Sequence, residues 1–74
     1  MVDMIALNAF VVFYRVQYET LHISTEYNVR CFRLCVMINN GMNYVTKFAY
    51  CDNTKQAKSI VNECVIDFLA RFGA

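Results

Sequence analysis

The first stretch of the chain carries apolar residues at helical spacing. Asp3 stands in its first turn, where the dipole of a helix favours a negative charge. The apolar positions are Met4, Ile5, Leu7, Phe10, Val11 and Tyr14. This spacing predicts a helix over about residues 2–14.

The middle of the chain changes to the two-residue period of strands. Between residues 31 and 38, Phe32, Leu34, Val36 and Ile38 alternate with Arg33, Cys35 and Met37. Alternation of this kind predicts a strand with one apolar side. Strand-compatible residues also occur at 18–24 and 44–50, separated from 31–38 by a polar break at 25–28 and by Asn39-Asn40-Gly41, a strong turn signal. We therefore expect three antiparallel strands, at 18–24, 31–38 and 44–50.

The last segment has a helix start signal. Asn53 can cap the helix, and Gln56 three residues later can bond back to the N–H of the cap. A wide apolar side follows, and Gly73 is placed to end the helix. We predict a helix over about 54–71. The order of elements favours an α+β fold with two helices packed on one face of a three-stranded antiparallel sheet.

Composition narrows the classes of function. The chain has 74 residues, 58% hydrophobic and 18% charged, whereas a typical soluble domain has about 45–50% and about 25%. One small domain over residues 1–74 is expected, and the apolar excess either lines its core or lies exposed as a binding surface. The formal net charge of +1 disfavours a strongly basic nucleic-acid binder, so anion binding needs a local cluster.

Membrane insertion and export are not indicated by the sequence. The longest apolar run, residues 9–14, is too short to span a bilayer, and the N-terminus is unlike a signal peptide. We expect an intracellular protein without a membrane partner.

Cysteine and histidine spacing indicates neither a metal centre nor an active site. Cys31 and Cys35 are four residues apart, the four cysteines form no C-x-x-C pair, and His22 is the only histidine. Zinc needs four convergent ligands, so no metal or cofactor is expected and the thiols should be free. Because these residues show no nucleophile and base arrangement, we predict a non-catalytic domain without a small-molecule substrate.

Several short motifs occur in the register of a known family. They are Leu7-Asn8, Tyr18 with Phe32 fourteen residues later, Phe32-x-Leu34-x-Val36-x-Ile38-Asn39, and Thr54-Lys55-Gln56-Ala57-Lys58. Over nearly the whole chain they resemble the double-stranded RNA-binding domain (dsRBD), most closely the dsRBDs of RNA-editing adenosine deaminases and nuclear-factor-type proteins. The resemblance implies an α-β-β-β-α fold, double-stranded RNA as partner, and a nuclear rather than cytoplasmic location.

The family recognises A-form duplexes by shape, using the first helix, the loop between the first two strands and lysines at the start of the last helix. Carried onto this chain, the resemblance assigns RNA contacts to the start of the last helix, with Asn28 in the loop and Ile5 in the first helix. The residues of the last helix are Asn53, Thr54, Lys55 and Lys58. Thr54 replaces a lysine of the family pattern, and the alternative for the lysines is an ordinary solvated helix face.

The loop and the first helix both depart from the family pattern. The groove-entering Gly-Pro-x-His of the family is replaced by residues 25–28, where Glu26 brings a negative charge and an ordinary polar loop is an equal alternative. Ala9 stands where the family often has an acidic contact, and Asn8 is expected to brace the fold. We therefore expect weak, shape-based binding, with a shallow salt dependence, by one domain of a longer protein.

The second hypothesis is a degenerate dsRBD that contacts a protein partner or a second copy of itself. If strand alternation holds, the sheet face turned away from the helices carries an apolar patch. Its expected members are Leu21, Ile23, Cys35, Met37 and Phe48. Phe48 is also placed where the third strand's edge is open to pairing with another copy. A slip of strand parity would instead bury some of these side chains.

Overall fold

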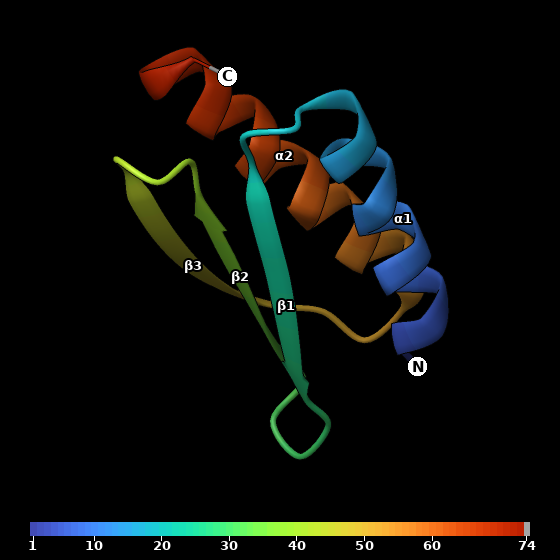
Figure 1. Cartoon of the computed structure of the whole chain (residues 1–74). Coiled ribbons are helices and arrows are strands. Elements are labelled where there is room, and N and C mark those ends of the chain that lie inside the picture. Colours follow the sequence, from blue (N-terminus) through green and yellow to red (C-terminus); the bar gives the residue numbers. More distant parts are fainter. Residues whose placement is uncertain (74) are drawn as a thin grey trace.

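The computed structural model describes residues 1–73 and has the order α-β-β-β-α (Figure 1). The elements are α1 (Met4–Gln17), β1 (His22–Asn28), β2 (Arg33–Asn39), β3 (Tyr44–Tyr50) and α2 (Thr54–Phe72). This order, with its three-stranded antiparallel sheet, confirms the predicted α+β, dsRBD-like fold class. Among the described residues, neither helix is both long and apolar enough to cross a membrane.

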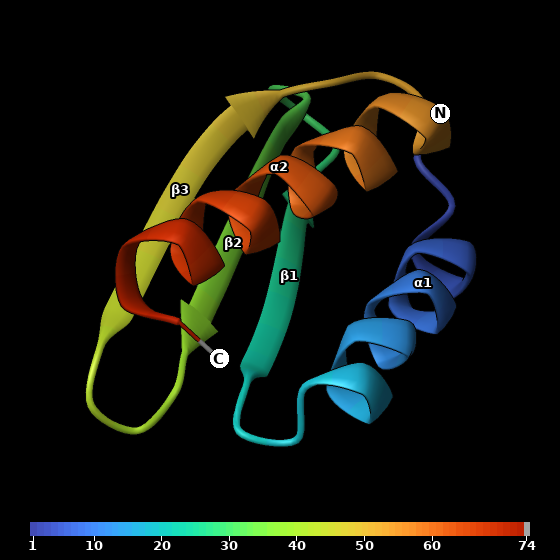
Figure 2. The same cartoon turned by 90° about the horizontal axis from the view of Figure 1, so that it is seen from above.

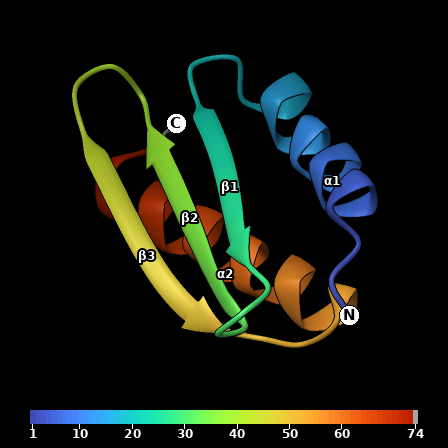
Figure 3. The ribbon, with the colours of Figure 1, turned by 90° about the horizontal axis from the view of Figure 1, so that it is seen from below.

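The strands lie in their sequence order, so β2 is central and β1 and β3 are the edges. Ile23 pairs with Ile38 across β1 and β2, and Cys35 pairs with Phe48 across β2 and β3. The view from above shows the two helices beside one another over the sheet (Figure 2). The view from below shows the strands in front of α2 (Figure 3). α1 contacts β1 and α2, whereas α2 also contacts β2 and β3. We call the sheet face turned away from the helices the outer face.

The core lies between the sheet and the helices. Alternate residues of β2 enter it, namely Leu34, Val36 and Ile38, and all three are buried. Phe68 is the largest of the fully buried side chains and comes from α2. Burial of these apolar surfaces is the main stabilisation available to a chain of this size.

The first strand differs from its prediction. It runs over His22–Asn28 rather than 18–24, and the expected polar break at 25–28 is part of it. The shift arises because α1 continues to Gln17, after which the N–H of Tyr18 donates to the carbonyl of Tyr14. The inward-facing polar side chains of β1 have partners, since the Tyr27 hydroxyl donates to the Cys51 carbonyl oxygen at 2.6 Å. Its outward-facing polar residues are exposed.

Phe32 was expected to share the buried side of β2, and this expectation is wrong. β2 begins at Arg33 instead of residue 31, and Phe32 lies in the preceding loop with more than half of its side chain exposed. Its φ of 55° lies in the left-handed region, which interrupts the alternation of the strand. Its carbonyl oxygen accepts a hydrogen bond from the N–H of Cys51 at 2.9 Å.

Each helix begins at a side-chain cap. Asp3 accepts from the N–H groups of Ile5 and Ala6 at 3.0 and 3.2 Å, so α1 starts two residues later than predicted. Asn53 accepts from the N–H of Gln56 at 2.8 Å, as expected from the sequence. The Gln56 side chain, however, bonds back to the N–H of Asp52 at 3.2 Å and not to that of the cap.

The ends of the other elements agree with the turn residues of the sequence. Gly73 ends α2 at a φ of 75°, with its N–H bonded to the carbonyl of Leu69. β3 spans the predicted residues, and the loop before it holds Gly41 at a φ of 89°. Asn40 stabilises that loop by accepting from the N–H of Asn43 at 2.7 Å.

Candidate nucleic-acid interface

The predicted phosphate-contacting residues of the last helix lie together at the start of α2. Asn53 is the cap, and Thr54 and Lys55 are the first two helical residues. Lys58 is one turn further and lies on the same side as Lys55, because residues three apart are neighbours on a helix. The ammonium groups of both lysines are therefore near the positive end of the helix dipole, a position that favours anions.

Thr54 has a structural role. Its hydroxyl oxygen accepts a hydrogen bond from the N–H of Asp3 at 2.8 Å and lies 3.4 Å from the carbonyl oxygen of Met1. These contacts connect the start of α2 with the segment before α1. The hydroxyl that the resemblance assigns to a phosphate is thus already engaged within the chain.

The two lysines differ in their freedom. Lys55 is exposed, whereas Lys58 is half-buried and its ammonium nitrogen lies 5.8 Å from the centre of the Phe10 ring. A cation over an aromatic ring within about 6 Å is weakly attracted to it. Lys58 is therefore partly oriented by α1, while Lys55 is free to follow a ligand.

The loop between β1 and β2 is shorter than the resemblance implies. It comprises residues 29–32, and Asn28 is the last residue of β1. The Asn28 side chain accepts from the N–H of Arg30 at 3.0 Å and so shapes the turn. Arg30 is exposed in this loop. Sequence reasoning missed Arg30 because it placed the loop four residues too early.

The segment before α1, the β1–β2 loop and the start of α2 meet at one end of the molecule (Figure 1). One surface hollow is lined by the segment before α1, the end of β1 with the loop after it, and the segment between β3 and α2. Its residues are Met1, Val2, Tyr27, Val29, Phe32 and Asp52. Partial burial raises the pKa of the Tyr27 phenol, and the nearby Cys51, Asp52 and Cys31 raise it further. At pH 7 the phenol is therefore neutral, able to donate its bond to Cys51.

The charges at this end are mixed. The positive side chains at this end of the molecule are Arg30, Lys55 and Lys58, and the negative ones are Asp3 and Asp52. Asp52 also accepts from the Asn53 side-chain amide at 3.3 Å. The remaining excess of positive charge is small, so any attraction to a polyanion depends on the two lysines and the arginine.

The other predicted contact, Ile5, lies in the first turn of α1 and is strongly exposed. Asn8, expected to brace the fold, faces β1, where the Thr25 hydroxyl lies 3.5 Å from its amide oxygen. Ile5 lies one turn before Asn8, as its neighbour on the helix surface, and on the side of α1 away from the buried Leu7 and Val11.

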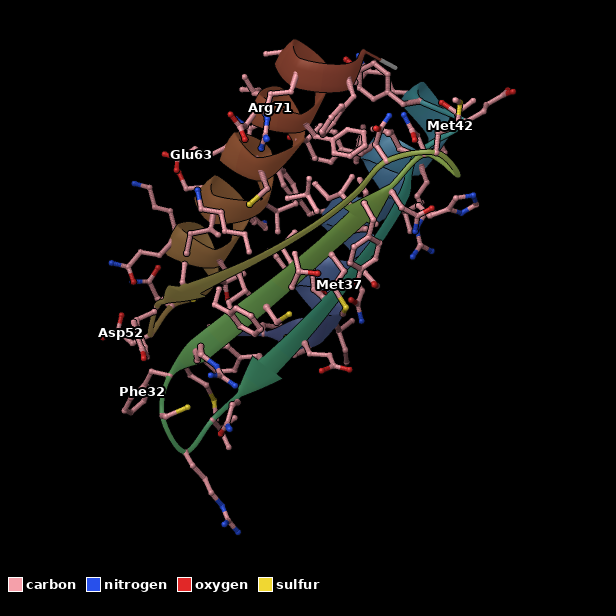
Figure 4. The ribbon with its side chains drawn as sticks, turned by 90° about the vertical axis from the view of Figure 1, so that its left-hand side faces the viewer. Phe32, Met37, Met42, Asp52, Glu63 and Arg71 are labelled. Carbon is pink, nitrogen blue, oxygen red and sulfur yellow. The ribbon has the colours of Figure 1, made fainter. Side chains whose placement is uncertain are left out.

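The predicted partner patch is only partly on the outer face. Leu21 and Ile23 are buried in the core, so their assignment to the outer face is wrong. The prediction counts the alternation from Tyr18, which is the C-cap of α1 and not a residue of β1, so its parity does not carry over to the strand. Cys35, Met37 and Phe48 do lie on the outer face, and Figure 4 shows Met37 on that surface of the sheet.

Two tyrosines and an arginine were missed on the outer face. Tyr44 and Tyr50 are exposed and share the parity of Phe48 on β3. The Arg33 guanidinium carbon lies 4.7 Å from the centre of the Phe48 ring. The sequence contains a signal for these tyrosines, because side chains two residues apart on a strand share a face. That signal is the spacing of Tyr44, Thr46, Phe48 and Tyr50.

The cysteines and acidic residues form no cluster suited to a metal. Within residues 1–73, no group of three or more His, Cys, Asp and Glu side chains is placed to hold a metal ion. Cys31 is exposed and Cys51 and Cys64 are buried, and all are free thiols. Burial raises the pKa of the Cys51 thiol, and Asp52 adds to the effect. A thiol kept neutral in this way is a poor nucleophile.

No family model, curated protein or solved structure matches the chain.

Proposed function

We propose that this protein is a non-catalytic domain that binds double-stranded RNA weakly, through its shape and phosphate contacts. The observation that supports this most directly is the pair Lys55 and Lys58 at the capped start of α2. A polyanion approaching there would meet two ammonium groups and the positive end of a helix dipole. The resemblance to dsRBDs supports an A-form duplex as the proposed partner.

The proposed contacts come from α2 and the β1–β2 loop. The β1–β2 loop, which contains Arg30, and the start of α2, which contains Lys55 and Lys58, lie toward the same end of the molecule, which suits a ligand that spans both regions (Figure 1). Lys47 and Arg71 contribute little. Arg71 is sixteen residues after Lys55 on one helix, about 24 Å along its axis, and Lys47 lies on β3 near Cys64.

The test is a titration of the isotope-labelled chain with an RNA duplex of about 16–20 base pairs, followed by NMR at low and moderate salt. We expect shifts at residues 30 and 53–58 and a log–log salt slope of about 2–3, since each neutralised phosphate contributes roughly 0.9 to the slope for B-form DNA. The Lys55→Gln and Lys58→Gln double variant should lose measurable binding.

A charge-matched control separates this site from a general effect of charge. Lys47→Gln with Arg71→Gln removes the same two positive charges at a distance from the start of α2. We expect this control to bind within about twofold of the parent. If the Lys55 and Lys58 double variant binds as tightly as the parent, or the control loses as much, the proposed site is wrong.

A second candidate function is contact with a protein partner through the outer face of the sheet. The observation that favours it is the exposed aromatic set on β3, with Arg33 stacked on Phe48 at 4.7 Å. Aromatic residues, Met and Arg are enriched where protein interfaces bind most tightly. Met37→Glu should abolish capture of such a partner, whereas Thr20→Glu, outside the sheet, should not. Equal capture by both variants would exclude this face.

A further inference from the structure

The side of α1 that faces away from the molecule is apolar. Its exposed residues are Ile5, Ala9, Val12, Phe13 and Val16, which we call the outer stripe. Ile5 is 85% exposed, Phe13 75%, Val16 76% and Val12 49%. Four large apolar side chains on one helix thus contribute little to the core of the chain.

The outer stripe lies opposite the buried side of α1. Leu7 and Val11 point into the core, and at about 100° per residue Ile5, Ala9 and Val16 lie about half a turn away from them. Figures 2 and 3 show this side of α1 open, with α2 and β1 on its other sides. A helix that is apolar on all sides is normally buried on all sides.

Charged groups do little to interrupt this surface. α1 contains one charged residue, Arg15. Its guanidinium donates to the Ile23 carbonyl oxygen at 2.5 Å, and so is directed toward β1 and not over the outer stripe. A contiguous patch of this kind on a small domain marks a contact surface.

The spacing of the outer stripe identifies the occupant. Ile5, Ala9, Val12 and Val16 are separated by four, three and four residues, the heptad spacing of helices that pack side by side. The sequence of intervals is the same in both directions. Two copies of α1 placed antiparallel therefore bring Ile5 opposite the partner's Val16 and Ala9 opposite the partner's Val12.

This pairing has the symmetry of a dimer. In a dimer with a two-fold axis, both copies use the same surface, so each contact occurs twice. The small Ala9 beside the partner's Val12 allows the two helix axes to approach closely at the centre. Antiparallel helix dipoles attract one another, and the Asp3 end of one helix comes near the Arg15 end of the other.

We propose that the outer stripe of α1 is a dimerisation surface that packs antiparallel against the α1 helix of a second copy of this chain. A large aromatic side chain such as Phe13 exposes on the order of 150 Å² or more. With its aliphatic neighbours, the outer stripe would bury roughly 1,000 Å² over both copies, the lower limit of specific interfaces. We therefore expect a reversible dimer with a dissociation constant on the order of micromolar to tens of micromolar.

This proposal does not depend on RNA binding. A dimer through the outer stripe covers Ile5, which then cannot enter a minor groove, but it leaves Lys55 uncovered on α2. Lys58 faces Phe10, which is on the α2 side of α1 and outside the outer stripe. The lysine variants test one proposal and stripe variants test the other.

The experiment is sedimentation equilibrium of the whole chain between about 5 and 500 µM. The parent should move from monomer to dimer mass, and Phe13→Glu and Val16→Glu should each weaken association at least tenfold. Ile66→Glu is the matched control, because Ile66 is an exposed apolar residue on the outside of α2. It should dimerise as the parent does. Circular dichroism establishes that each variant remains folded.

A mixing experiment tests the antiparallel pairing. Ile5→Lys and Val16→Glu should each be monomeric alone, and an equimolar mixture should recover a heterodimer in which the new lysine meets the new glutamate. A parallel pairing would place these charges apart and give no recovery. The proposal is overturned by a parent that stays monomeric to 500 µM, by stripe variants that dimerise normally, or by a dimer that Phe48→Glu abolishes and Val16→Glu does not.

Discussion

The two helices relate differently to the rest of the molecule. α2 buries one side, and its exposed residues include the charged Lys55, Glu63 and Arg71. Glu63 and Arg71 are labelled in Figure 4. The buried residues of α2 are Ala57, Val61, Cys64, Val65 and Phe68. α1 buries only Leu7 and Val11 fully, and its outer side is the apolar stripe.

This difference separates what the fold explains from what it leaves unexplained. The pattern of α2, apolar inside and charged outside, is what a single folded chain requires. The pattern of α1 exceeds that requirement, because Ile5, Phe13 and Val16 gain little burial within the chain. A contact outside the chain accounts for them, and four predictions test this contrast between the helices.

The largest effect is expected in the core side of α2. Phe68→Ala should lower the free energy of unfolding by about 3–5 kcal/mol, because it removes a fully buried aromatic ring. That loss is close to the whole stability of a small domain, so Phe68→Ala is expected to be largely unfolded. Phe68→Leu should lose less stability, and its free energy of unfolding can therefore be measured. Phe13→Ala should change stability by less than about 0.5 kcal/mol.

Urea denaturation at a protein concentration below the dimer range measures both variants. The concentration matters because a dimer contact would add to the apparent stability of the parent. If Phe13→Ala lost as much as Phe68→Leu in the monomer, Phe13 would belong to the core and the contrast between the helices would fail.

The caps are expected to give the next largest effects. Asn53→Ala and Asp3→Ala should each cost about 1 kcal/mol, since each removes the acceptor for the first N–H groups of its helix. Asp3→Asn and Asn53→Asp keep the acceptor and serve as controls. Far-UV circular dichroism with urea denaturation measures the losses. A cap variant without any loss would show that tertiary contacts alone fix the start of that helix.

Sequence patterns predicted some elements well and others poorly, for physical reasons. β3 and α2 were placed nearly residue by residue because turn residues and caps bound them. Gly41 lies in the loop before β3, Asn53 caps the start of α2 and Gly73 ends it. β1 was placed four residues too early because its polar residues were interpreted as a loop. Within the sheet those polar groups have partners, such as the Cys51 carbonyl for Tyr27.

The candidate site was predictable to a similar extent. Lys55 and Lys58 follow a cap that the sequence reveals, so their shared side of α2 was foreseeable. The engagement of the Thr54 hydroxyl with Asp3 was not, because fifty-one residues separate the partners in the sequence. Leu21 and Ile23 were misplaced because one error in strand parity moves every side chain to the other face.

The third prediction concerns alkaline pH. Burial raises the pKa of the Cys64 thiol in α2 above its ordinary value of 9.0; Lys47 opposes the shift, and Glu63 and Asp67 add to it. Because the folded-state pKa is the higher one, the thiol's stabilisation is complete below pH 9 and is lost as the pH rises through the folded-state pKa. In α1, burial and Tyr18 raise the pKa of Tyr14 above 10.0, so its contribution is lost at higher pH.

Urea midpoints at pH 7.5, 9 and 10, under reducing conditions, measure this effect. The midpoint of the parent should fall between pH 9 and 10, and Cys64→Ala should fall less over the same interval. Tyr14→Phe also loses the hydrogen bond that the Tyr14 hydroxyl donates to Asn62, so its midpoint should be lower at every pH. Relative to pH 7.5, its midpoint should diverge from that of the parent only near and above pH 10. If the urea midpoint fell equally in the parent and in Cys64→Ala, the pKa of the Cys64 thiol would be the same in the folded and unfolded states.

The smallest effect is expected on the outer side of α2. Asp67 and Arg71 are four residues apart, with a carboxylate–guanidinium distance of 3.9 Å and both side chains well exposed. Such pairs contribute about 0.5 kcal/mol or less, and salt screens them. Asp67→Ala should therefore lower the melting temperature slightly at low salt and hardly at all in 0.5 M NaCl. Arg71→Ala should lose somewhat more, because its guanidinium also lies 5.2 Å from the centre of the Phe72 ring. Salt should weaken an ion pair that is exposed to solvent. If Asp67→Ala lowered the stability by more than about 1 kcal/mol, and by the same amount at low and high salt, the Asp67–Arg71 pair would be covered by a further contact, and the contrast with α1 would fail.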